Sequence, residues 1–277
     1  MALASRKIEL RTGVTLDYVA QGDPSGVPVI FMHGLSDSWR SYAPILPRLP
    51  DSIKAFAFSL RGHGDSDRPD EGYGVEDFGG DLEAFMDALR INEAVIVGHS
   101  GSSPVAQRFA IDHPERIFGL VLVGAFADMT TDPAIRQFWE TGVSRLEDPV
   151  DEGFVRDFQA SVKPIPPAFF ETVIEESLKL PARVWKEVVS ATMRDKVFDE
   201  VHKITVPTLI FWADADDFIS RESQEELREA IPEARLVTYE DTGHNLHWEE
   251  PERFASDLAE FVDREIAPRH REAERRL

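Results

Sequence analysis

Apolar runs alternate along the chain with longer segments in which apolar residues recur at helical spacing. The runs are "VPVIFMHG" at 27–34, "KAFAFSL" at 54–60, "EAVIVGHS" at 93–100, "GLVLVGA" at 119–125 and "PTLIFWA" at 207–213. They are apolar throughout, as expected of parallel strands whose two faces are both covered by helices. The earlier stretches "KIELRTG" and "TLDYVAQG" do alternate, and they predict an antiparallel hairpin at the sheet edge. The pattern therefore predicts the α/β class, with a mostly parallel sheet and helices on both of its faces.

The connection between Ala125 and Pro207 is much longer than the usual link between a helix and a strand. It holds about eighty residues. Four segments in it combine helical spacing with aromatic side chains: "DPAIRQFWETGV", "DEGFVRDFQASV", "PPAFFETVIEESLKL" and "PARVWKEVVSATM". We expect residues 126–206 to form a helical cap, or lid, inserted after the sixth strand, and residues 1–125 and 207–277 to form the core domain.

Charge and composition narrow the classes of partner. The chain has 277 residues, 51 acidic against 30 basic, and a net charge of −21. Such a surface repels phosphate backbones and anionic membranes, so neither nucleic acid nor membrane is an expected partner. Cysteine is absent, which excludes disulfides and thiolate chemistry and agrees with a reducing compartment. The opening "MALASRKIEL" has no apolar run of signal-peptide length, and "GLVLVGAFA" is far shorter than the ~20 residues that span a bilayer. We expect a cytoplasmic protein.

The stretch Gly98-His99-Ser100-Gly101-Ser102 joins a predicted buried strand directly to a predicted helix. A turn this tight leaves no room for bulk two residues either side of its apex, which accounts for Gly98 and the small Ser102. The turn also exposes the apex side chain and aims the first helix amides, including that of Gly101, at anything bonded to it. The local pattern therefore predicts a nucleophile elbow with Ser100 at its apex.

A serine hydroxyl attacks a carbonyl only when a neighbouring base removes its proton and a third group orients that base. His244 follows a glycine in the loop after the last predicted strand, "ARLVTY", and His247 competes with it three residues further on. The order serine, acid, histidine is the order of triads on this sheet topology. The candidate acids are Asp214, Asp216 and Asp217 in "FWADADDFIS" and, after the sixth strand, Asp128.

Three further stretches lie in register with one known family. "FMHGLSDS" at 31–38 resembles the His-Gly oxyanion loop after that family's third strand, "RGHGDSDRP" at 61–69 the loop after its fourth, and "HPERI" at 113–117 the turn before its sixth. Over nearly its whole length the chain resembles the α/β-hydrolase fold family, and especially its capped esterases and lactonases. The resemblance implies an eight-stranded sheet with Ser100 as nucleophile, His244 as general base and Asp216 as the orienting acid.

The same resemblance suggests roles for neighbouring groups. It makes the backbone amides of Leu35 and Gly101 the oxyanion hole. Asp216 is favoured because "WADAD" matches the family's Trp-Gly-x-x-Asp, with Ala213 in place of the glycine. Ser102 departs from the family, which more often has glycine there, and its side chain tightens the approach of helix to strand. Supporting roles fall to His33, Gly34, His99 and His247, with His33 and His99 expected to hold loops by hydrogen bonds.

Aromatic side chains of the expected cap serve two purposes. Most are assigned to packing within the cap, and a minority facing the sheet would make an apolar cavity suited to an uncharged ester or lactone. The seven aromatic residues concerned, packing and cavity-lining together, are Phe126, Phe138, Trp139, Phe158, Phe169, Phe170 and Trp185. The aspartate cluster has no further oxygen ligands in sequence, and neither GxxxxGK nor HExxH occurs, so we expect no metal and no cofactor.

These features predict a serine hydrolase that cleaves a carboxylic ester or lactone of a small, largely apolar substrate through an acyl-enzyme. The expected partner is that small molecule, and a homodimer is compatible with the sequence. Ser100 argues against an epoxide hydrolase or haloalkane dehalogenase, because displacement at an sp³ carbon uses a carboxylate at the elbow. Two alternatives stay open: a carbon–carbon hydrolase with the same triad, acting on a vinylogous diketone, and a slow-turnover ligand-binding or signalling protein.

Overall fold

The computed structural model describes residues 3–275, which form one eight-stranded sheet in the order β1-β2-β4-β3-β5-β6-β7-β8. The first two strands are antiparallel to their neighbours, and the other neighbouring pairs are parallel. The predicted α/β class, the edge hairpin and the mostly parallel eight-stranded sheet are confirmed. The strands are β1 (Arg6–Glu9), β2 (Thr15–Gln21), β3 (Val27–Met32), β4 (Ile53–Phe58), β5 (Ala94–His99), β6 (Ile117–Val123), β7 (Thr208–Ala213) and β8 (Arg235–Tyr239).

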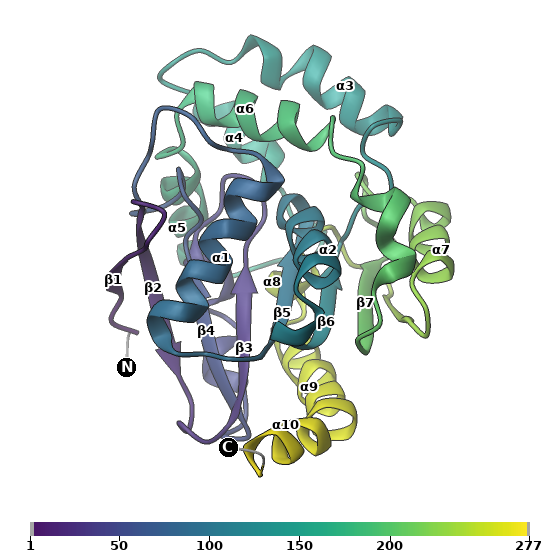
Figure 1. Cartoon of the computed structure of the whole chain (residues 1–277). Helices are drawn as coiled ribbons and strands as arrows, with labels where there is room; N and C mark the ends of the chain where they lie inside the picture. Colours follow the sequence, from purple (N-terminus) through teal and green to yellow (C-terminus); the bar gives the residue numbers. More distant parts are fainter. Residues whose placement is uncertain (1–2, 276–277) are drawn as a thin grey trace.

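Helices cover both faces of the sheet, which explains why the central strands are apolar throughout. The helices outside the long β6–β7 connection are α1 (Val75–Leu89), α2 (Ser103–Asp112), α7 (Arg221–Ala230), α8 (Leu246–Glu249), α9 (Pro251–Phe261) and α10 (Ala267–Glu274). In β5, Ile96 packs in one apolar cluster with residues of α1 and α2, whereas Val95 and Val97 pack in another with residues of α8 and α9. Successive strand side chains point to opposite faces, so each strand contributes to both clusters. Figure 1 shows α1 and α2 crossing the same face of the sheet.

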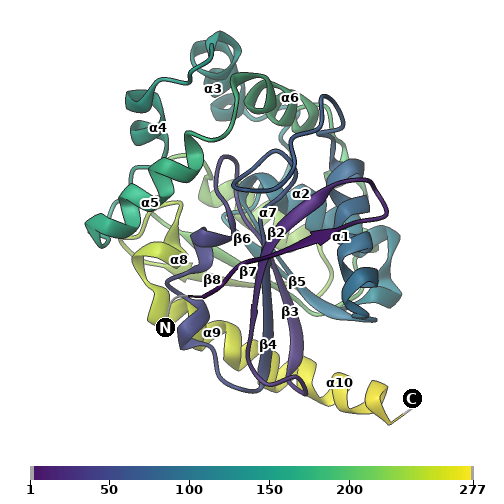
Figure 2. The ribbon, with the colours of Figure 1, turned by 90° about the vertical axis from the view of Figure 1, so that its left-hand side faces the viewer.

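The connection between β6 and β7 carries four further α-helices among the described residues: α3 (Pro133–Thr141), α4 (Glu152–Phe158), α5 (Pro167–Ser177) and α6 (Ala182–Thr192). Asp132 and Asp151 start α3 and α4, because each side chain accepts hydrogen bonds from backbone amides of the first helical turn. Figures 1 and 2 show these helices gathered above one end of the sheet. We call residues 126–206 the cap segment; its standing as a separate domain stays a prediction.

Short helical turns lie between these elements, and the last of them is a π-helical turn that joins α9 to α10. They are η1 (Trp39–Tyr42), η2 (Leu46–Arg48), η3 (Ser100–Ser102), η4 (Pro114–Arg116), η5 (Val143–Arg145), η6 (Val197–Lys203) and η7 (Val262–Ile266). No helix within residues 3–275 is long and apolar enough to cross a membrane.

Candidate active site

Ser100 stands at a sharp turn between β5 and α2. Its φ of 50° lies in the left-handed region that residues with a Cβ rarely adopt, which is typical of a strained functional turn. A Cβ added at Gly98 would lie 2.7 Å from the Cβ of Ala106 and 3.0 Å from the carbonyl oxygen of Ser102, so only glycine fits there. The chain therefore builds the elbow geometry that its sequence predicts.

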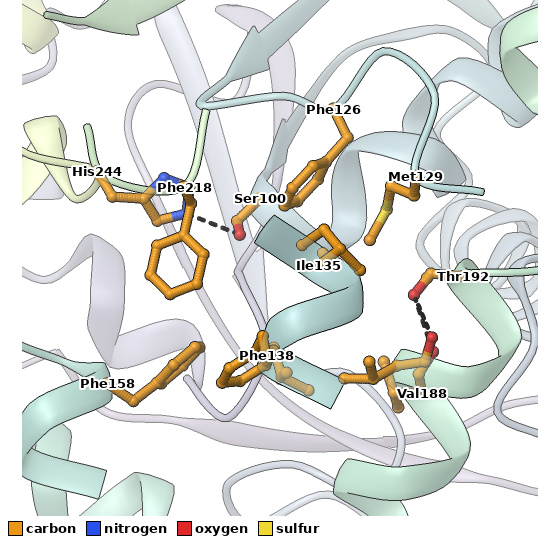
Figure 3. A pocket seen from close by; sticks show the side chains of 13 residues that line it. Ser100, Phe126, Met129, Ile135, Phe138, Phe158, Val188, Thr192, Phe218 and His244 are labelled. Carbon is orange, nitrogen blue, oxygen red and sulfur yellow. Dashed lines mark hydrogen bonds between the residues drawn. The ribbon is translucent and has the colours of Figure 1, made fainter. Parts of the chain in front are cut away.

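Three side chains from different loops meet at this turn. The Nε2 atom of His244 lies 2.8 Å from Ser100 Oγ, and its Nδ1 atom lies 2.7 Å from Asp216 Oδ2. Because an ionised carboxylate only accepts hydrogen bonds, Nδ1 carries the proton of the neutral ring and Nε2 is free to accept from the serine hydroxyl. Figure 3 shows the His244 ring aimed at Ser100. This arrangement can remove the proton of Ser100 during attack.

Asp216 is the one candidate acid that the structure places against His244 in the described chain. Its Oδ1 atom accepts hydrogen bonds from the amides of Phe218 at 2.8 Å and Ile219 at 3.0 Å, and its side chain is 1% exposed. Asp128 instead accepts hydrogen bonds from the hydroxyls of Thr130 and Thr131. Of the other candidates, Asp214 accepts from the amide of Asp241, and Asp217 is exposed.

The charge of Asp216 sets the basicity of the ring. Burial by itself would lower the pKa of His244, but the charge and hydrogen bond of Asp216 outweigh it and raise the pKa above its ordinary value. Gly124 directly follows β6 and has a φ of 49°. It leaves room for the His244 ring, since a Cβ on this residue would lie 3.1 Å from His244 Cε1. In the sequence, Gly124 lies within a predicted strand, and no pattern indicates this role.

The backbone nitrogen of Leu35 lies close to Gly101, the residue that follows Ser100. A Cβ on Gly101 would lie 3.4 Å from the nitrogen of Leu35. Leu35 belongs to a turn in which the Asp37 amide donates to the carbonyl oxygen of Gly34 at 3.3 Å, and Ser36 has a φ of 65°. Two backbone amides close to one serine are the kind of donor pair that an oxyanion hole uses.

Of the four supporting residues, His33 and Gly34 act on this turn directly. His33 Nδ1 donates to the Gly34 carbonyl oxygen at 2.7 Å, and its Nε2 atom accepts from the Leu60 amide at 2.9 Å. Burial keeps the pKa of His33 well below its ordinary value, so the ring is a neutral brace, as expected. A Cβ on Gly34 would lie 2.9 Å from His99 Nδ1, which makes glycine necessary for the close packing of the loop on the elbow.

His99 and His247 contribute in another way. No hydrogen bond of ordinary geometry reaches either ring nitrogen of His99 within residues 3–275, although the His244 backbone lies close enough to act on the pKa of the ring, so the expectation that His99 holds a loop by hydrogen bonds stays a prediction. Its ring instead packs against His247, with centroids 4.5 Å apart, and His244, at 5.2 Å. His247 Nε2 lies 3.1 Å from Ser41 Oγ, so its hydrogen bond runs to the core loop and not to Ser100. The His99 ring thus packs on His244 directly, and the His247 ring packs on His99.

An apolar cavity opens directly onto Ser100 and His244. Of the seven predicted cap aromatics, Phe126, Phe138 and Phe158 line it. None of the described residues around it is Lys, Arg, Asp or Glu, and the hydroxyl of Thr192 donates to the carbonyl oxygens of Val188 and Val189. Figure 3 shows the rings of Phe138, Phe158 and Phe218 below Ser100 and His244. The remaining lining residues are Leu35, Gly101, Met129 and Ile135.

The comparison with known proteins decides the family. The sequence profile of the family described as "alpha/beta hydrolase fold" matches residues 27–251. The chain belongs to the α/β hydrolase fold family. Its relatives in that family include the AB hydrolase superfamily protein YisY of Bacillus subtilis (strain 168), 28% identical over 85% of this chain and 91% of that protein. Another is the 2-hydroxymuconate semialdehyde hydrolase of Pseudomonas sp. (strain CF600), 27% identical over 86% of this chain and 87% of that protein.

Solved structures of this fold superimpose closely. The esterase EaEST from Exiguobacterium antarcticum matches with a TM-score of 0.82 and 22% identity, covering 94% of this chain and 100% of that one. At that identity the likeness concerns the fold. The α/β hydrolase fold explains how one serine, one aspartate and one histidine far apart in sequence reach one point, since each follows a strand at the carboxyl edge of the same sheet.

Sequence reasoning missed several residues at the cavity. Phe218 lies two residues beyond Asp216 and packs on His244, with ring centroids 5.5 Å apart. Val188 and Thr192 are four residues apart, so the sequence itself indicates that they share one face of α6. What the spacing could not say is whether that face turns toward the sheet or toward solvent.

Proposed function

We propose that this protein is a serine hydrolase that cleaves a carboxylic ester or lactone of a small, largely apolar substrate through an acyl-enzyme. One observation carries the proposal: the connected hydrogen bonds of 2.8 Å and 2.7 Å from Ser100 through His244 to Asp216, at the mouth of an apolar cavity. That geometry matches the nucleophile, base and orienting acid of acyl transfer.

The first half-reaction forms the acyl-enzyme. Ser100 Oγ attacks the substrate carbonyl carbon while His244 Nε2 takes the hydroxyl proton. The electron pair of the carbonyl moves to its oxygen, which accepts hydrogen bonds from the Leu35 and Gly101 amides. As the tetrahedral adduct collapses, the bond to the leaving oxygen breaks and His244 gives its proton to that oxygen. An alcohol departs, or in a lactone the ring opens.

The second half-reaction restores the serine. His244 Nε2 takes a proton from a water molecule, whose oxygen attacks the acyl carbon, and the same two amides stabilise the second oxyanion. Collapse breaks the bond to Ser100 Oγ, which recovers its proton from His244, and a carboxylic acid leaves. Asp216 keeps its charge throughout and stabilises the imidazolium form of His244.

A carbon–carbon hydrolase is the second candidate, because it can use the same three residues. The relative named 2-hydroxymuconate semialdehyde hydrolase is 27% identical to this chain. We rank it second because the described lining of the cavity has no Lys or Arg to pair with an acidic diketone. Turnover of a vinylogous diketone that exceeds turnover of simple esters would reverse this order.

The first test is labelling with a fluorophosphonate, which reacts with activated serines, followed by intact mass and peptide mapping. We expect one adduct on Ser100 in the wild type and none in Ser100→Ala or His244→Ala. Asp216→Asn should lower ester turnover by about 10⁴-fold, because the ring then loses its tautomer and its charge partner. Asp128→Asn is the matched control and should stay near wild type. No adduct in folded wild-type protein would reject the hydrolase and favour a ligand-binding protein.

A further inference from the structure

The carboxamide of Gln159 reaches from the cap segment into the loop that carries Leu35. Gln159 directly follows α4 and is 2% exposed. Its Nε2 atom lies 2.8 Å from Asp37 Oδ1, 2.9 Å from Ser177 Oγ and 3.1 Å from Ser36 Oγ. Ser36 and Asp37 belong to the core loop, whereas Gln159 and Ser177 belong to the cap segment. One buried amide thus joins the two.

The loop that Gln159 contacts does not hold its shape by local preference alone. Ser36 has a φ of 65°, a left-handed conformation that a residue with a Cβ adopts only when its surroundings impose it. Its hydroxyl accepts from Gln159 and donates to Ser177 Oγ at 3.2 Å, so both of its side-chain bonds run to the cap segment. The residue before Ser36 is Leu35, whose amide is the proposed oxyanion donor.

Asp37 adds a second reason why the loop depends on the cap. Its carboxyl group is 3% exposed, and no Lys or Arg of the described residues pairs with it. Its side-chain donors are the Ser41 hydroxyl, at 3.2 Å from Oδ2, and the Gln159 amide. The Gly34 backbone and the charge of His244 also act on it, and Nδ1 of His99 lies 4.0 Å away. A buried carboxyl group with few donors is costly to leave unsatisfied, so removing Gln159 favours a rearrangement of the loop.

We propose that Gln159 is a positioning residue that makes the placement of the Leu35 amide depend on contact between the cap segment and the core. The proposal rests on the proposed hydrolase function. It implies that the oxyanion hole is complete only while the cap is seated, so that carbonyl activation and enclosure of the substrate occur together. Because the oxyanion forms only in the transition state, the contact acts on kcat and leaves KM nearly unchanged.

The test measures kcat and KM for p-nitrophenyl acetate and the rate of fluorophosphonate labelling at Ser100. Gln159→Ala should lower kcat and the labelling rate by roughly 10- to 100-fold, the size expected when a reacting group shifts by a fraction of an ångström to about 1 Å. KM should stay within about threefold of wild type. Gln137→Ala, at an exposed glutamine of α3, is the matched control and should match wild type.

A double variant separates positioning from simple loss of stability. Asp37→Asn combined with Gln159→Glu keeps one amide and one carboxylate but exchanges their places, so the amide of residue 37 can donate to the carboxylate of residue 159. Recovery of kcat in this variant, above that of Gln159→Ala, is the expected result. If Gln159→Ala does not fold, the double variant is compared with Gln159→Glu alone, and equal kcat in those two proteins would overturn the inference.

Wild-type kcat in folded Gln159→Ala would overturn the inference while leaving the hydrolase intact. A rise in KM with unchanged kcat would also overturn it, because the residue would then act on ground-state binding. Absence of labelling and turnover in the wild type would instead overturn the proposed function, and this inference with it.

Discussion

The hydroxyl of Ser102 donates a hydrogen bond to the carbonyl oxygen of Met32 over 2.9 Å. Ser102 stands just after the elbow, and Met32 is the last residue of β3, directly before the loop that carries Leu35. The same hydroxyl accepts a hydrogen bond from the His99 amide at 3.0 Å. The residue that departs from the usual glycine therefore ties the nucleophile turn to the start of the oxyanion loop.

This tie makes Ser102 important for stability. Ser102→Ala should lower the free energy of unfolding by about 1–2 kcal/mol, because it leaves the buried His99 amide without its side-chain acceptor and removes one donor from the Met32 carbonyl, which keeps the hydrogen bond from the Tyr42 hydroxyl. Urea unfolding measures the loss. Ser52→Ala, at an exposed serine, should stay within about 0.5 kcal/mol of wild type. Equal stability of the two variants would mean that the hydrogen bonds at Ser102 add nothing.

The pH dependence of turnover should report the charge of His244. Burial lowers its pKa, but Asp216 more than offsets that and raises it above 6.5. The base must be neutral, so kcat/KM should fall as pH drops through this pKa, with a midpoint above 6.5. Asp216→Asn removes the raising charge, so its residual activity should show a lower midpoint. Profiles from about pH 5 to about pH 9 test this, and identical midpoints would contradict it.

Asp37 should make the protein less stable as pH rises. Burial raises its pKa to about 7 from an ordinary 3.8, although hydrogen bonds from Gln159 and Ser41 favour the charged form. Between these values the folded state holds a proton that the unfolded state has released, so stability is lost as pH increases. From about pH 5.5 to about pH 8.5 this contribution amounts to about 2 kcal/mol.

Asp37→Asn removes that titration. Urea unfolding of both proteins at the two pH values should show the additional loss in the wild type and not in the variant. His244 and Asp37 interact electrostatically, and the charge of Asp37 raises the pKa of His244, so the difference between the two proteins reports the coupled titration of this pair. A loss of equal size in both would assign the pH dependence to other groups.

The apolar lining of the cavity should exclude charged acyl groups. An ester of butyrate and one of the same length ending in a carboxylate differ by one charge, which the cavity would have to bury without a partner. We expect kcat/KM for the charged ester to be lower by at least about 100-fold. Val188→Arg, which places a cation in the lining, should narrow this difference. Comparable turnover of both esters by the wild type would show that the acyl group binds elsewhere.

Glu249 should control how firmly the cap segment rests on the His244 loop. Its carboxylate accepts hydrogen bonds from the amides of Gly243 at 3.0 Å, Val162 at 2.9 Å and Lys163 at 3.0 Å. Glu249→Ala should therefore speed hydrogen exchange at these amides by more than about tenfold, measured by mass spectrometry. Glu229→Ala, at an exposed glutamate of α7, is the control. Unchanged exchange would show that other contacts hold the segment.

Much of the fold was predictable because strands that are buried on both faces appear in the sequence as continuous apolar runs. The strands β3 to β7 are apolar at successive positions, and they lie where the runs predict them. The elbow was predictable for a similar reason: only a tight turn requires Gly98, Ser100 and small neighbours in that order. The choice among aspartates was weaker, since Asp214, Asp216 and Asp217 share one loop and differ only in direction.

The sequence by itself determined the sheet, the order of its chemical groups and the place of the elbow serine, because these follow from local periodicity and turn sterics. The tertiary structure alone decided which carboxylate faces His244, which cap aromatics line the cavity, and that Gln159 meets Asp37 across 122 positions of chain. Such contacts depend on how helices rotate and dock once the core has formed. Sequence spacing constrains that rotation only weakly, because several faces of a cap helix are apolar enough to pack.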